Sequence, residues 1–74
     1  MFRLNKINPK KLLNSTWTAV HPVQKELHFI VTDLRLNQEG EVVHCELEAI
    51  MTKRSRIIEW QTLTDSDEWL QGWK

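Results

Sequence analysis

The sequence predicts a single small β-rich domain, residues 1–74, built around a four-stranded antiparallel meander. Two observations predict this mainly β class: apolar and polar residues alternate over Glu41–Met51, and a turn-forming segment stands directly before that alternation. The length of 74 residues allows one domain. The pattern leaves open whether the sheet closes partly into a small barrel.

The N-terminal segment carries a short helical turn and the first strand. Asn8-Pro9 is a helix-start signal, because asparagine caps helices well and proline suits the first helical position. The turn over Pro9–Asn14 would bury its leucines. Trp17–His21 then reads as a short strand, which Pro22 ends or places at a sheet edge, since proline cannot donate to a ladder.

The middle of the chain predicts a long hairpin. Leu27–Leu36 is the second strand, and its apolar residues on both faces are typical of a central strand or of one that bends across a core. Asn37–Gly40 forms the turn, with Gly40 available for positive φ. In the third strand, Glu41–Met51, the long alternation is a stronger signal than the helix propensity of its Glu, Leu, Ala and Met residues.

The C-terminal third completes the sheet and covers it. Residues 52–54 turn the chain, and Ser55–Gln61 is the predicted fourth strand. The segment Thr62–Glu68 is polar and irregular, and a short turn there would carry Trp69 and Leu70 inward. The expected core residues are Leu13, Trp17, Ala19, Phe29, Val31, Val43, Cys45, Leu47, Ala49, Ile58, Trp60, Trp69 and Leu70.

Charge and cysteine content narrow the class of protein. Ten basic residues balance ten acidic ones, which argues against a dedicated polyanion binder because phosphate affinity grows with the charges neutralised. Cys45 is the only cysteine, so no intrachain disulfide forms, and a lone thiol fits a reducing, cytoplasmic compartment. No segment has the apolar length of a signal peptide or a membrane span, so no membrane association is expected.

Four stretches of the sequence are distinctive as a set. They are N-P-K-K-L-L-x-S-x-W-T-A-V over residues 8–20, K-E-x-H-F-x-V over 25–31, E-A-x-x-T-K-R over 48–54 and W-L-Q-G-W-K over 69–74. With them the chain resembles a small tryptophan-rich family of conserved hypothetical bacterial proteins, whose members share its size and its four tryptophans. The resemblance supports a single domain and implies no activity, substrate or partner.

The tryptophans are the most conspicuous residues of the chain. Each ring buries on the order of 200 Å², so we expect Trp17, Trp60 and Trp69 to fill a small core. Trp73 stands near the chain end and is expected to be partly exposed. The alternative is an exposed aromatic surface that contacts a base, a peptide or a partner.

One candidate surface is basic and belongs to the alternative function, binding of single-stranded nucleic acid, RNA in particular. Such binding combines positive charge with aromatic platforms. Charged residues at a sheet edge also block aggregation, which is the simpler interpretation. The candidate residues are Lys10, Lys11, Lys53, Arg54 and Arg56.

The preferred function is a protein-interaction module, which uses strand edges or leftover apolar surface. Ile50, Ile57 and Trp73 are the candidate residues for contact with a protein partner or with a second copy in a homodimer.

Neither a metal, a cofactor nor a catalytic site is expected. His44 and Cys45 are adjacent on a strand and so point to opposite faces. No C-x-x-C or H-x-x-x-H spacing occurs, and the acidic residues before Trp69 match turn chemistry rather than a calcium loop. An enzyme is not expected, because a core of this size can hardly spare a pocket of about 300 Å³.

Overall fold

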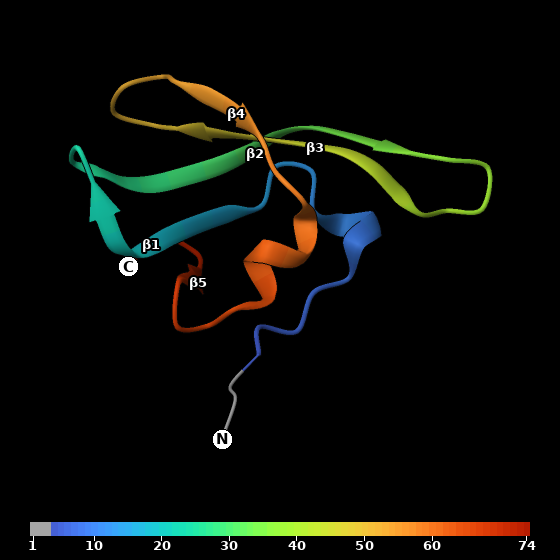
Figure 1. Cartoon of the computed structure of the whole chain (residues 1–74), viewed down its shortest axis with the longest axis horizontal. Helices are drawn as coiled ribbons and strands as arrows, with labels where there is room; N and C mark the ends of the chain where they lie inside the picture. The colour runs from blue at the N-terminus through green and yellow to red at the C-terminus, as the bar shows by residue number, and fades with distance from the viewer. Residues whose placement is uncertain (1–3) are drawn as a thin grey trace.

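The computed structural model describes residues 4–74 and shows one antiparallel sheet of five strands. The first four strands form a meander in chain order, and the fifth returns to pair with the first, which gives the order β4-β3-β2-β1-β5 (Figure 1). The two edge strands do not pair with each other, so the sheet is open and not a barrel. The elements are η1 (Pro9–Lys11), β1 (Thr16–Val23), β2 (Glu26–Leu36), β3 (Val42–Ala49), β4 (Ser55–Ile57), η2 (Trp60–Thr64) and β5 (Trp69–Gln71).

The C-terminal part departs most from the prediction. The fourth strand ends at Ile57 rather than at Gln61, and the chain then leaves the sheet for the short 3-10 helix η2. That helix places Leu63 in the core, fully buried. The segment around Trp69, expected as a covering turn, is instead a strand hydrogen-bonded along β1.

The predicted hairpin turn over Asn37–Gly40 is confirmed. Asn37 organises the β2–β3 turn, because its Oδ1 accepts the backbone N–H of Glu39 and of Glu41, each at 2.9 Å. Gly40 has φ +81°, the left-handed conformation that glycine adopts without steric cost. The β1–β2 turn needs only Gln24 and Lys25, both at positive φ, as a tight two-residue hairpin requires.

Two bulges in the β2–β3 hairpin decide which side chains face the core. Val31 pairs with Leu47 and Asp33 with Glu46, so Thr32 is an extra residue in β2. Beyond it the alternation is reversed, and Leu34 returns to the same face as Val31. This explains why the sequence of β2 shows apolar residues at positions of both parities.

The second bulge corrects the predicted core. Leu36 pairs with Val42 and Arg35 with His44, which leaves Val43 without an opposite residue. Val42 therefore packs against the core, whereas Val43 is 63 % exposed. The alternation read from sequence holds from Cys45 onward and fails at the bulge.

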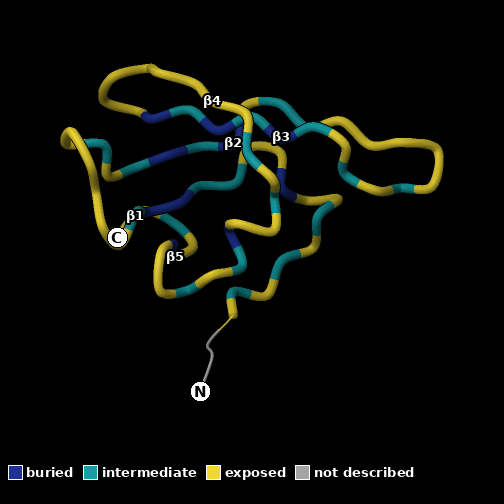
Figure 2. Tube along the Cα trace, viewed as in Figure 1, coloured by how far each residue is buried: buried dark blue, intermediate teal, exposed yellow. Residues whose placement is uncertain are grey.

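The core lies on one face of the sheet, under η1, η2 and the N-terminal segment (Figures 1 and 2). The predicted Leu13 and Leu70 are exposed, and Leu12 fills the place expected for Leu13. Leu12 caps η1, and Ser15 donates to its carbonyl in a tight turn that leaves Leu13 outside. The buried core consists of Leu12, Trp17, Phe29, Val31, Cys45, Leu47, Ala49, Leu63 and Trp69, with Ala19, Ile58 and Trp60 partly buried against it.

We call the opposite side of the sheet the open face. Along each strand, the side chains on this face alternate with those that point into the core. The open face carries Ile30 of β2, Glu46 and Glu48 of β3 and Ile57 of β4. No helix crosses this face in the part of the chain that the structure describes. In those residues the C-terminal tail folds back onto this face and places Trp73 beside His28.

Candidate functional site

The predicted basic residues do not gather on one surface. Lys10 lies beside Gly40, because a Cβ added there would meet Lys10 Cε at 3.4 Å. Gly40 lies just before the start of β3, whereas Arg54 lies beside its end. There the backbone carbonyl of Arg54 accepts the N–H of Ala49. The length of β3 separates the two ends by roughly 23 Å at the usual rise per residue. A single basic face, as the sequence suggested, is therefore not formed.

Lys11 lies on a third surface. With Lys6 it borders a largely apolar groove of about 420 Å³ beside the end of β5, whose walls include Ile7, Leu12 and Trp17. Lys53 occupies the tight β3–β4 turn at positive φ. Only Arg54 and Arg56, of the five predicted residues, share a site.

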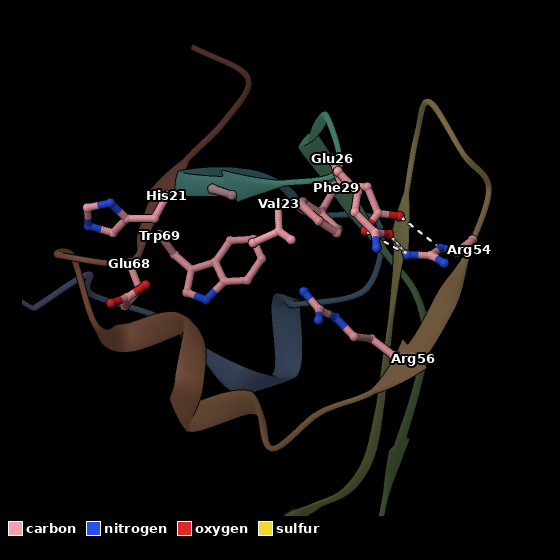
Figure 3. Close-up of a pocket in the computed structure, with 10 residues that line it drawn as sticks. His21, Val23, Glu26, Phe29, Arg54, Arg56, Glu68 and Trp69 are labelled. Atoms are coloured by element: carbon pink, nitrogen blue, oxygen red, sulfur yellow. Dashed lines mark hydrogen bonds and ion pairs between the residues drawn. The ribbon is translucent and has the colours of Figure 1, made fainter.

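That site is a cleft of about 380 Å³ on the core-bearing side of the sheet (Figure 3). It exists because β1 bends: the register passes from Thr18–His28 to Val23–Glu26, so four residues of β1 stand opposite Leu27 alone. The end of β1 turns sharply away from its first half (Figure 1). Pro22, which the sequence predicts as a strand end or an edge position, lies within β1 in this bend, and β1 is not an edge strand.

A carboxylate in the cleft binds one of the two arginines. Glu26 Oε2 accepts a hydrogen bond from Thr52 Oγ1 at 2.5 Å and lies 3.3 Å from Arg54 Nε. The hydrogen bond from Thr52, with those from Arg54 and its charge, holds the pKa of Glu26 below its usual value. Arg54 also donates to the side-chain carbonyl of Gln24. The β3–β4 turn is thus tied to the start of β2, and the charge of Arg54 is matched by Glu26.

Arg56 is held differently. Its guanidinium carbon lies 5.6 Å from the centroid of the Phe29 ring, a cation–π contact. Phe29 in turn meets Trp69 edge to face, with ring centroids 5.1 Å apart. Both rings are buried, so neither offers a free surface on which a nucleobase stacks. Within residues 4–74, no ion pair involves Arg56.

Trp73, one of the predicted contact residues, lies on the open face. It is 52 % exposed, as predicted, but the tail that carries it is not loose. Its Nε1–H donates to the carbonyl of Phe29 at 3.0 Å, and its ring centroid is 5.9 Å from that of His28. Buried Thr18 fixes the tail from beneath, because its hydroxyl donates to Gly72 O at 2.7 Å and accepts from Lys74 N–H at 2.9 Å.

The other two predicted contact residues share this face. Ile50 donates its N–H to the carbonyl of His28 and stands on the same side as Trp73, so both flank that histidine. Ile57 pairs with Glu46 across β3–β4 and is exposed. The sheet therefore brings the three apolar candidates to one face, with the carboxylates of β3 between them.

Metal-binding and nucleophilic groups are dispersed. His21 borders the cleft, His28 packs on Trp73, and His44 Nε2 lies 3.3 Å from Asp33 Oδ2. No three metal-ligating side chains gather within residues 4–74. Cys45 is buried, and burial raises the pKa of its thiol, which disfavours the reactive thiolate.

The acidic residues before Trp69 form a turn that is closed by hydrogen bonds to Asp65. Asp65 Oδ1 accepts the N–H of Asp67 at 3.0 Å, and the carbonyl of Asp65 accepts the N–H groups of Glu68 and Trp69. This agrees with the interpretation from sequence. The same carbonyl satisfies an outward-facing donor of edge strand β5.

Comparison with known proteins identifies one family. The family model described as Tryptophan-rich protein (DUF2389) matches residues 15–74, a span that includes all four tryptophans. No curated protein and no solved structure matches the chain. Separately, none of the helices found in residues 4–74 has the length and apolar character to cross a bilayer.

Proposed function

We propose that this chain, which belongs to the tryptophan-rich DUF2389 family, is a non-catalytic protein-interaction module whose contact surface is the open face. The observation that supports it most is Trp73, an indole that is half exposed and yet fixed by its hydrogen bond to Phe29. A rigid, exposed aromatic ring loses little conformational entropy on binding, and tryptophan is enriched among residues that dominate binding energy.

The carboxylates that β3 presents on the open face indicate the kind of partner. Glu46 and Glu48 lie two residues apart on the same face of β3, about 7 Å from each other at the usual strand rise. Within residues 4–74 neither forms an ion pair, and their contacts are the hydroxyls of Thr32 and Ser55. We infer a partner segment with apolar side chains flanked by lysine or arginine, because such a segment supplies the missing positive charge.

A second copy of this chain fits the open face less well. Two copies that met through it would each bring Glu46 and Glu48 to the interface, and like charges brought together oppose association. Sedimentation at several concentrations tests this. We expect a monomer; a dimer that Trp73→Ala abolishes would assign the open face to self-association instead.

Selection from a random peptide library displayed on phage, with the full chain immobilised, tests the proposed partner. We expect enriched peptides with apolar residues next to lysine or arginine, and binding at least tenfold weaker to Trp73→Ala, about 1.4 kcal/mol. Leu13→Ala, which shortens an exposed leucine outside the open face, is the matched control and should bind as wild type. Enrichment without dependence on Trp73, or no enrichment, would contradict the proposal.

Binding of single-stranded RNA is the alternative, and it has less support. Arg54 is already matched by Glu26, and the rings nearest Arg56 are buried. A titration with labelled single-stranded RNA and DNA at low salt decides it. We expect no binding in the micromolar range; salt-dependent binding lost on Arg56→Gln would favour the alternative.

A cytoplasmic location is part of the proposal. The support is the buried, lone Cys45, which suits a reducing compartment. Cell fractionation with a cytoplasmic marker tests it, and recovery of the chain in a secreted fraction would contradict it.

A further inference from the structure

We infer that the cleft of Figure 3 binds a small organic monoanion, a carboxylate on an apolar body, through the guanidinium of Arg56. This site is separate from the open face and goes beyond the proposed interaction function. It lies between β4, the bent end of β1 and the start of β5.

At the β4 end of the cleft, the guanidinium of Arg56 is available to bind a carboxylate from outside. Two arginines and one carboxylate meet there, and that carboxylate, on Glu26, is taken by Arg54 and Thr52. Glu26 is also the group whose pKa Arg56 lowers by its charge, so Arg56 contributes to the local positive potential without an ion pair of its own. At this end of the cleft an incoming carboxylate meets a guanidinium that no carboxylate of residues 4–74 pairs with.

Arg56 is also oriented for recognition. Its guanidinium carbon lies within cation–π distance of the Phe29 ring, and Figure 3 shows the side chain directed into the cleft toward Trp69. A guanidinium presents paired N–H donors that match the two oxygens of a carboxylate.

The rest of the cleft defines the body of the ligand. Ala19 and Val23 supply apolar surface to the cleft, to which the nearly buried rings of Phe29 and Trp69 add only their edges, and about 380 Å³ lies at the small end of ligand-site volumes. Glu68 lines the cleft as well, on the side of Trp69 away from Arg56 (Figure 3). Its carboxylate repels a second negative group, so a monoanion fits better than a dianion or a polyphosphate.

Benzoate is the probe that tests this site, with neutral benzamide as its isostere. Titration of the ¹⁵N-labelled full chain should give saturable shifts at the Trp69 indole N–H and the Arg56 Nε–H. We expect benzoate to bind about tenfold tighter than benzamide, because hydrogen bonds to a charged group are the stronger ones. Arg56→Gln should abolish the difference, and Arg56→Lys should reduce it, since lysine keeps the charge without the fork.

The control is Arg35→Gln, which removes an exposed arginine outside the cleft and should leave benzoate binding unchanged. Equal affinity for benzoate and benzamide, unchanged binding to a folded Arg56→Gln variant, or shifts centred on Lys6 and Lys11 would each overturn the inference. Binding of the selected peptides to Arg56→Gln separates this inference from the proposed function, because they should bind that variant as tightly as wild type.

Discussion

The two faces of the sheet use tryptophan in different ways. Trp17 and Trp69 lie on the covered face and are buried, whereas Trp73 lies on the open face and is half exposed. The indole N–H is hydrogen-bonded on both faces: Trp17 Nε1 donates to Ser15 Oγ at 2.9 Å, and Trp73 Nε1 donates to Phe29 O at 3.0 Å. The rings differ in what surrounds them. Trp17 and Trp69 are packed in the core and build the fold, whereas Trp73 is half exposed and, in our proposal, contacts a partner.

The largest expected effect comes from truncating one ring on each face. Trp17→Ala should lower the free energy of unfolding by about 3–5 kcal/mol, because it leaves a large cavity. That loss is comparable to the whole stability of many domains of this size. Trp73→Ala should cost only about 1 kcal/mol, close to the value of its hydrogen bond. Urea unfolding followed by circular dichroism measures both, and equal losses would contradict the division between the faces.

Two adjacent leucines sharpen the comparison within one segment. Leu12 is 2 % exposed and Leu13 is 48 % exposed. Leu12→Ala should cost about 2–5 kcal/mol, whereas Leu13→Ala should stay within about 0.5 kcal/mol of wild type. Thermal unfolding of both variants is the measurement. A larger loss for Leu13→Ala would mean that the N-terminal segment packs in another register.

Thr18 lies on the open face of β1, opposite His28, and holds the tail that carries Trp73. Thr18→Val keeps the shape and removes the bonds to Gly72 and Lys74. We expect a loss of about 1–3 kcal/mol and faster amide exchange at Lys74. Hydrogen exchange by NMR measures the second effect; unchanged protection at Lys74 would show that the tail is held by other contacts.

The smallest effect concerns pH. The folded state holds the pKa of Glu26 below its usual value. The ionised Glu26 therefore stabilises the fold above the unfolded-state pKa, and this stabilisation is lost as pH falls through the lower folded pKa. Glu26→Gln should therefore flatten the fall in stability below about pH 4.3, the ordinary pKa of glutamate. Glu59→Gln, on an exposed residue, is the control, and a pH profile unchanged by Glu26→Gln would contradict the hydrogen bonds that Thr52 and Arg54 give to Glu26.

Local signals account for the parts of the fold that the sequence predicted. Period-two alternation gave the third strand, and Asn37 and Gly40 gave the hairpin turn that the structure confirms. The bulges at Thr32 and Val43 have no such signal, because an extra residue is recognised only once two strands are paired. Strand β5 was missed for a related reason, since Trp69 pairs with Ala19 across fifty residues of chain.

The candidate sites likewise depend on contacts between residues that lie far apart in the sequence. The exposure of Trp73 was predicted from its place near the chain end, but the tail is fixed by hydrogen bonds to Phe29 and Thr18. The basic residues were predicted as one set, and the length of β3 separates Lys10 from Arg54. The cleft itself depends on the bend of β1, whose register follows from its pairing with β2.

Chemical-shift mapping of the wild-type domain with a selected peptide tests the central claim most directly. We predict that the perturbed amides and indole cluster on the open face, around Ile30, Glu48, Ile50 and Trp73. A map centred on the cleft of Arg56, or on the edge of β4, would contradict the account.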